Sequence, residues 1–317
     1  MNFDFTEDQE LVRSSLESLL ARHPAQLHGE PAFWLAGEAI GNELAENGFM
    51  NLVRDADQPL LSAVLMIETV AKAPHAVEIT ASALIAPLIS STPMAGPIAL
   101  TTQNTGAPIR FLPQARTLLV DAGDVIRVVD VTEEPVTMVA SPYGYPLGRM
   151  NSATLTGGGA VLDDVDPERV RMLWRLGLAA EILGAMAAAL ELTTDYVRTR
   201  TQFGRPIGTF QVIQHRLSEC LTLVESTRLL VRDAAARSDI AGAALAVGFA
   251  QEAAARLIYE THQFHGAIGL TLEYPLHFWT YKLRLLQGEL GGVIGQGRCA
   301  AAQLWAPGRT IVEGFRS

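Results

Sequence analysis

The stretch YVRTRTQFGRPIGTFQVIQHRL, residues 196–217, carries the signals for the end of one helix, a turn and the start of another helix. Gly204 can adopt the positive φ of a helix C-cap, Pro206 cannot continue a helix, and Thr209 is a favourable N-cap. Apolar side chains then recur at helical spacing, at Phe210, Ile213 and Leu217. The stretch therefore predicts a rigid helix–turn–helix elbow.

Composition changes twice along the rest of the chain. Residues 6–92 read mostly as helix, with Thr6 as the first N-cap and a further helical run over residues 76–88. Gly, Pro and Thr clusters then separate short β-branched runs at residues 117–120, 125–129 and 136–139. Long Ala- and Leu-rich helices return after residue 166, with breaks near residues 204–208, 238–242, 266–275 and 288–292. We therefore expect a mainly α protein with a β insert: an N-terminal helical domain (1–92), a short β domain (93–165) and a C-terminal four-helix bundle (166–317).

Charge and hydrophobicity exclude several classes of protein. The 317 residues carry a formal net charge of −10, which argues against general binding to nucleic acid or to an anionic membrane. Hydrophobic residues make up 49% and charged residues 18%, as expected for helices that are buried on several sides or contact other subunits. The longest apolar stretches, residues 178–192 and 240–258, are rich in Ala and interrupted by polar residues such as Glu181, so we expect packed helices and not membrane spans.

The start of the chain and its cysteines bear on compartment and metal binding. The first residues are polar and acidic, which predicts no secretory signal. Cys220 and Cys299 have no metal-ligand spacing, and the same holds for His215, His262 and His277. We therefore expect a cytoplasmic protein without a disulfide or a metal site.

A second block, QFHGAIGLTLEYP at residues 263–275, completes a recognisable pair of motifs. Together with the elbow it resembles the flavin-binding signatures of the acyl-CoA dehydrogenase family. The elbow matches that pattern at Arg200, Gln202, Phe203, Gly204, Pro206, Ile207, Phe210, Gln211 and Gln214. The second block matches at Gln263, Gly266, Gly269, Glu273, Tyr274 and Pro275, with Ala267 where the family usually has glycine. The order of helices, strands and helices also resembles the family fold over nearly the whole chain.

The resemblance implies that the chain helps to hold FAD, largely across a subunit interface. The implied contact residues are Arg200, Gln202, Phe203, Phe210, Gln211, Gln263, Gly266 and Gly269. Arg200 matches the pyrophosphate-binding arginine, and a guanidinium offers several fixed donors to a diphosphate. The alternatives are ordinary structural roles: an ion pair of Arg200 with Glu191 or Asp195, core packing of the two phenylalanines, and a plain helix C-cap at the glycines.

The resemblance places the catalytic base less well. In the family a carboxylate abstracts the α proton of the acyl-CoA while the flavin accepts a hydride from the β carbon. The commoner base position aligns with Leu290, so Glu289 fits only after a one-residue shift, and the alternative position holds Trp174. The family segments that cradle the flavin ring have no clear counterpart, residues 99–106 being the nearest candidate.

The chain keeps the motifs that reach across a subunit interface but lacks a clear counterpart of the segments that cradle the flavin ring. In this respect it resembles the short subunits of heteromeric acyl-CoA dehydrogenases from actinobacterial steroid catabolism. This implies a subunit that forms a 2-enoyl-CoA from an acyl-CoA, paired with a longer homologous chain as α2β2, with electron-transfer flavoprotein as the acceptor. Two alternatives stay open: a self-sufficient homo-oligomeric dehydrogenase that uses Glu289, and a non-catalytic scaffold subunit. Spacing alone does not identify the acyl group.

Overall fold

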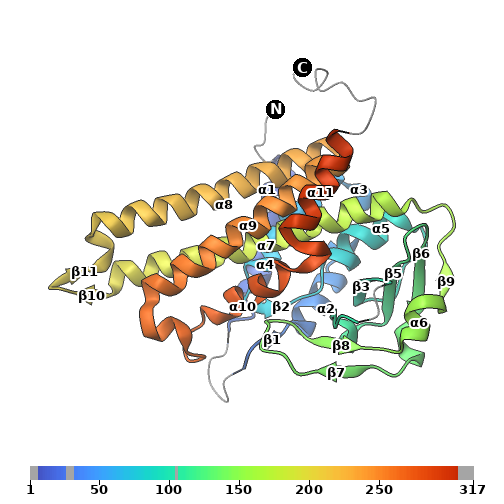
Figure 1. Ribbon diagram of the computed structural model, residues 1–317, viewed down its shortest axis with the longest axis horizontal. Helices are drawn as coiled ribbons and strands as arrows, with labels where there is room; N and C mark the ends of the chain where they lie inside the picture. The colour runs from blue at the N-terminus through green and yellow to red at the C-terminus, as the bar shows by residue number, and fades with distance from the viewer. Residues whose placement is uncertain (1–5, 26–31, 104–105, 306–317) are drawn as a thin grey trace.

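The computed structural model describes residues 6–25, 32–103 and 106–305. The chain is mainly helical, with two small sheets between an N-terminal group of helices and a long C-terminal bundle (Figure 1). This order confirms the expected fold class. The sheets lie at one end of the long axis, and the turn between α7 and α8 lies at the other.

The N-terminal helices pack around a buried helix, α4 (Pro59–Ala71), in which residues 62–70 are all buried. The first helix, α1 (Glu7–Ala21), begins at the predicted cap. The Thr6 hydroxyl accepts from the Gln9 backbone N–H, and the Gln9 side-chain oxygen accepts from the Thr6 backbone N–H. The other elements here are α2 (Glu38–Glu46), η1 (Phe49–Asn51), α3 (Leu52–Asp55) and α5 (Ala86–Ile89).

The helix expected over residues 76–88 begins later than predicted. Residues His75–Ala76 form a short strand, β2, that pairs in parallel with β1 (Leu35–Ala36). A π-helical turn, η2 (Thr80–Ile85), then leads into α5. The pairing with β1 keeps this part of the chain extended, a non-local contact that the helical spacing of apolar residues did not reveal.

The middle part contains a four-stranded and a three-stranded sheet. The first has the order β3-β5-β6-β9, in which β3 (Ile98–Thr102) runs parallel to β5 (Thr117–Asp121), while β6 (Ile126–Asp130) and β9 (Ala160–Val161) are antiparallel to their neighbours. The second is antiparallel, with the order β4 (Ile109–Arg110), β8 (Leu147–Arg149) and β7 (Thr137–Val139). The three β-branched runs in the sequence form β5, β6 and β7, as predicted.

The C-terminal bundle is built around α7 (Pro167–Thr199), which packs against α8 (Gln211–Arg237), α9 (Ile240–His265), α10 (His277–Leu286) and, on its other side, α4. A last helix, α11 (Gly292–Leu304), packs on α9. By length and composition α7 could cross a membrane, but 83% of its apolar window is buried inside the protein, as in the core helix of a globular fold. Gly184 is required for the contact with α4, because a Cβ there would lie 2.2 Å from the Glu68 carbonyl oxygen.

The elbow differs from the predicted helix–turn–helix. Helix α7 ends at Thr199, and a two-residue hairpin, β10 (Thr201–Gln202) paired with β11 (Arg205–Pro206), precedes α8. Phe203 and Gly204 form its turn with φ of 52° and 79°, the double positive φ of a type I′ turn. Gly204 therefore takes the expected positive φ in a hairpin turn, not in a helix cap. Phe210, not Thr209, occupies the N-cap of α8.

Candidate functional site

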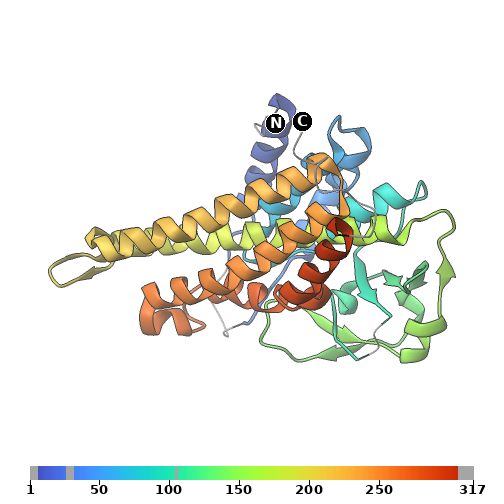
Figure 2. The same cartoon turned by 45° about the horizontal axis from the view of Figure 1, so that its top comes forward.

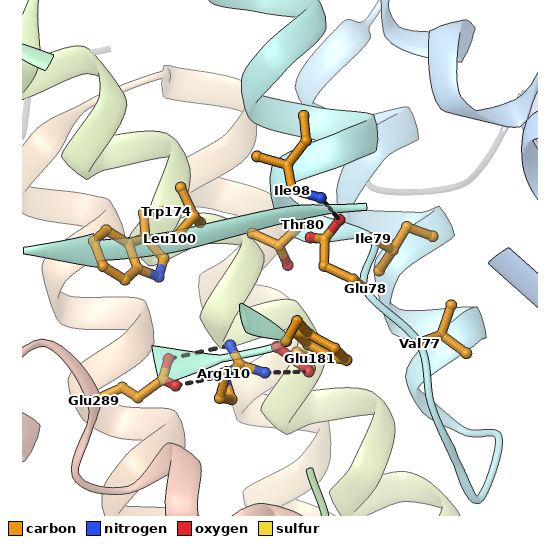
Figure 3. A pocket seen from close by; sticks show the side chains of 11 residues that line it. Val77, Glu78, Ile79, Thr80, Ile98, Leu100, Arg110, Trp174, Glu181 and Glu289 are labelled. Atoms are coloured by element: carbon orange, nitrogen blue, oxygen red, sulfur yellow. Dashed lines mark hydrogen bonds and ion pairs between the residues drawn. The ribbon is translucent and has the colours of Figure 1, made fainter. Parts of the chain in front are cut away.

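Three charged side chains from distant parts of the chain meet where the sheets contact the bundle. Glu289 lies in the short turn η7 (Glu289–Gly291) between α10 and α11, Arg110 lies on β4, and Glu181 lies on α7. The Arg110 guanidinium contacts Glu289 with two nitrogens, Nε to Oε1 at 2.5 Å and Nη2 to Oε2 at 3.1 Å. Its Nη1 contacts Glu181 Oε1 at 2.8 Å, so Arg110 bridges both carboxylates (Figure 3).

Further polar groups complete this cluster. The Tyr145 hydroxyl donates to Glu181 at 2.6 Å, and its ring lies 4.6 Å from the Arg110 guanidinium carbon. Lys282, which is buried nearby, donates to the carbonyl oxygens of Ala73 and His75. Burial lowers the pKa of Lys282 to about 7. Burial also lowers the pKa of Arg110, but the charges of Glu181 and Glu289 outweigh it, so the pKa of Arg110 is raised and the guanidinium stays charged.

The cavity left beside this cluster is about 30 Å³, the space of one water molecule. The indole of Trp174, at the family's alternative base position, fills part of the wall. Pockets that take small molecules and cofactors usually measure about 300–1,000 Å³. A flavin ring therefore does not fit in this cleft with Arg110 in place.

Glu289 combines one favourable and one unfavourable property for a catalytic base. Burial raises its pKa above the ordinary value, against the opposing effect of Arg110, and a raised pKa suits a general base. Its two oxygens, however, are both held by Arg110, and the adjoining space does not admit a substrate. Because a base must first reach its proton, the geometry outweighs the pKa.

The predicted FAD contacts of the elbow lie at the opposite end of the molecule, on and beside the β10–β11 hairpin (Figure 2). Phe203 is 90% exposed, and the side chains of Arg200, Gln202 and Gln211 are exposed as well. Phe210 is half-buried, with the Arg205 guanidinium 4.2 Å above its ring. Exposed aromatic and amide groups on a projecting hairpin are available to another molecule, not to the core.

Arg200 has no carboxylate partner in the described part of the chain. It follows the last residue of α7, and Asp195 instead contacts Arg198 at 3.7 Å. The surface ion pair considered above as its alternative role is therefore not formed. A free arginine at this position remains available for an anion.

The second motif is held against the elbow by ring stacking. Helix α9 ends at His265, and Gly266 follows with φ of 62°, as expected for a helix C-cap. The ring of Tyr196, near the end of α7, stacks on His265 at 4.4 Å, and Tyr274 packs beside them at 4.8 Å from His265. Gly269 is buried, and a Cβ there would lie 2.7 Å from His265 Cβ. The structure thus brings both motifs together, with Gln263 and Gly266 exposed.

Sequence reasoning missed Arg110, Tyr145 and Lys282. The signal for Arg110 was an arginine within the apolar run Ile-Arg-Phe-Leu at residues 109–112, and for Glu181 a carboxylate within an Ala-rich helix. Either pattern indicates a buried charge that needs a partner. The nearest candidate for a flavin cradle, residues 99–106, includes residues 104–105, which lie outside the described residues.

Comparison with known proteins identifies a domain in the C-terminal part of the chain. Residues 172–291, from within α7 to the end of η7, match the profile of the acyl-CoA dehydrogenase C-terminal domain. This segment of the chain is an acyl-CoA dehydrogenase C-terminal domain. FAD is the cofactor of acyl-CoA dehydrogenases, as the resemblance implied.

Curated relatives match parts of the chain. Acyl-CoA dehydrogenase IpdE2 of Mycolicibacterium smegmatis is 41% identical over 102 residues, which cover 32% of this chain and 33% of IpdE2. Acyl-CoA dehydrogenase FadE28 of Mycobacterium tuberculosis is 32% identical over 198 residues, 59% of this chain and 58% of FadE28. The aligned segments thus span about a third to just over half of these relatives.

Solved structures share the fold of the whole chain. A glutaryl-coenzyme A dehydrogenase complex superposes with a TM-score of 0.75 at 19% identity, covering 96% of both chains. The ChsE4-ChsE5 complex from Mycobacterium tuberculosis gives a TM-score of 0.72 at 22% identity, covering 96% of this chain and 99% of that one. These likenesses establish the acyl-CoA dehydrogenase fold.

The described residues hold no group of three His, Cys, Asp or Glu side chains placed to bind a metal ion. Cys220 and Cys299 are both free thiols. Burial raises the pKa of Cys220 to about 11, so this thiol stays protonated at neutral pH. The described residues therefore give no support for metal chemistry or for a reactive Cys220 thiolate.

Proposed function

We propose that this chain is one subunit of a heteromeric, FAD-dependent acyl-CoA dehydrogenase that forms a 2-enoyl-CoA. A longer homologous chain would supply the cleft for the flavin ring and the catalytic base. The α2β2 assembly, a steroid-derived acyl group and electron-transfer flavoprotein as acceptor belong to the same proposal. They are supported by the resemblance to short subunits of steroid-catabolic complexes.

One observation carries the proposal: the chain's own cleft is filled, while its interface motifs are exposed. Arg110 occupies the cleft and binds both carboxylates there. The β10–β11 hairpin, which contains Phe203 and directly follows Arg200, lies at the other end of the long axis from the sheets that carry Arg110. These residues therefore serve a cofactor bound to another subunit, or no cofactor at all.

Exposed apolar side chains on the bundle support association with a second, homologous chain. They are distributed over the outer surfaces of α8, α9 and α11 and include Val212, Leu221, Leu229, Leu245, Tyr259 and Ile294. Association with another helical bundle would remove this apolar surface from water. The low share of charged residues in the sequence has the same explanation.

The residues of the elbow and the second motif would position FAD in the partner. When bound, FAD supplies the hydride acceptor for oxidation of the acyl group. Arg200 would bind the diphosphate, Gln202, Gln211 and Gln263 would donate or accept hydrogen bonds, and Phe203 and Phe210 would cover apolar parts of the cofactor. The glycines Gly266 and Gly269 allow a close approach of the backbone.

The substitution Glu289→Gln tests where the base lies. If the partner supplies it, the rate of flavin reduction by substrate should change less than about threefold, because Glu289 only pairs with Arg110. Loss of a true general base costs about 10²- to 10⁴-fold. The measurement is anaerobic flavin reduction in a single turnover by the assembled complex. A collapse of that rate with FAD and acyl-CoA still bound would place the base in this chain and contradict the proposal.

A further inference from the structure

A second, larger cavity lies between the N-terminal helices and the four-stranded sheet. It measures about 470 Å³ and is lined by α2, η1, α3, the η2–α5 segment and the loop before β3. Glu78 and Ile98 form part of the wall of both this cavity and the small one beside Arg110. None of Arg110, Glu181 and Glu289 lines the larger cavity, so it is separate from the cluster around Arg110. Its volume lies within the range of about 300–1,000 Å³ that is usual for ligand sites.

Apolar groups make up much of the wall. They come from Met50, Ala86, Met94, Pro97 and Ile98, on four different segments of the chain. Gly41 on α2 leaves further space, since a Cβ there would meet no atom within 4 Å. The cavity can therefore accept an apolar body without displacing side chains.

Two arginines without carboxylate partners also line the cavity. Arg54 on α3 donates to the Ser90 carbonyl oxygen at 2.7 Å, and the Arg116 side chain makes no ion pair within the described residues. The nearby carboxylate of Glu38 accepts from the Gln114 amide at 2.6 Å. Both arginines are exposed at the cavity and neither pairs with a carboxylate among the residues that the structure describes, so their guanidinium groups are available to an anion.

Glu78 is the other acidic residue of the wall, and its oxygens are already engaged. They accept from the Ala81 backbone at 2.7 Å, from the Ser82 hydroxyl and from the Ile98 backbone at 3.5 Å. Burial raises the pKa of Glu78 to about 7, which reduces its negative charge at neutral pH. Glu78 therefore fixes the start of η2 and does little to neutralise the arginines.

We propose that this cavity binds a small molecule with an apolar body and one anionic end group, a carboxylate or a phosphate. The anionic group would lie at Arg54 and Arg116, and the body would lie against Met50, Met94 and Ile98. The site belongs to this chain alone and does not depend on the FAD proposal.

Isothermal titration calorimetry of the full chain with three ten-carbon probes tests the site. Decanoate, decyl phosphate and decanol share a body, so the first two distinguish carboxylate from phosphate and the third lacks the charge. We expect at least one anionic probe to bind about tenfold or more tightly than decanol. Equal affinity for all three, or no binding of either anion at millimolar concentration, would overturn the proposal.

Two variants locate the binding. Gly41→Leu fills the cavity from a helical position with open space, so the chain should fold and the anionic probe should bind at least about tenfold more weakly. Arg116→Gln should weaken the binding of the anionic probe by about three- to tenfold and leave the affinity for decanol unchanged. The matched control is Arg149→Gln, an exposed arginine on β8 away from the cavity lining, which should have no effect. Binding unaffected by both cavity variants would refute the site.

Discussion

Replacement of Arg110 by methionine is expected to lower the free energy of unfolding by about 3–5 kcal/mol, since it removes the cation between two buried carboxylates. Methionine keeps the apolar volume of the side chain but leaves Glu181 and Glu289 as neighbouring like charges. Urea unfolding of the parent and the variant, followed by circular dichroism, measures the difference.

The pH dependence of this loss is diagnostic. Burial and the charge of Glu181 raise the pKa of Glu289, and without Arg110 nothing opposes them, so the folded variant binds more protons than the unfolded chain. The loss of stability should therefore be largest at neutral pH and shrink as the pH falls toward 5. Adding Glu289→Gln should recover part of the loss, while Arg149→Met should stay within about 0.5 kcal/mol of the parent. A loss below about 1 kcal/mol at pH 7 would show that Arg110 does not hold the cleft closed.

Replacement of Arg200 by alanine is expected to weaken FAD binding by the assembled complex about 10- to 150-fold, the equivalent of losing a charge-assisted contact worth about 1.5–3 kcal/mol. The fold should be unchanged, because the Arg200 side chain has no ion pair within the described residues. The measurement is the FAD dissociation constant of the parent and variant complexes at one salt concentration.

Arg198→Ala is the matched control, since Arg198 is exposed, lies two residues earlier and pairs only weakly with Asp195 at 3.7 Å. It should leave the FAD affinity unchanged. A change below about threefold for Arg200→Ala, with activity retained, would favour the scaffold subunit over a shared cofactor site.

Local signals predicted most of the fold. The Thr6 cap and the β-branched runs depend on a few neighbouring residues and are confirmed, and so is the helical spacing of Leu and Ala except at residues 76–79. The β10–β11 hairpin was missed because each strand has only two residues. In addition, Phe203 takes a positive φ, which is uncommon for a bulky residue and is not predicted from its type. A proline in the second strand also reads as a plain helix break.

The cleft could not be predicted in the same way. The partners of Arg110 lie 71 and 179 positions away in the sequence, on α7 and η7, so no spacing pattern connects them. The motifs around Arg200 and Gln263 were visible because each is a continuous block. The predicted FAD contacts were therefore visible in the sequence, whereas the Arg110 cluster was visible only in three dimensions.

The most direct test of the account is the ratio of FAD to chains in purified material. The chain should be purified alone and together with a longer homologous partner, with flavin measured by absorbance and chains by quantitative amino-acid analysis. We expect a flavin-poor chain when it is purified alone, and one FAD for each pair of unlike chains in the complex. One FAD bound to every copy of this chain in a homo-oligomer would show that its own cleft opens to take the flavin, and would contradict the account.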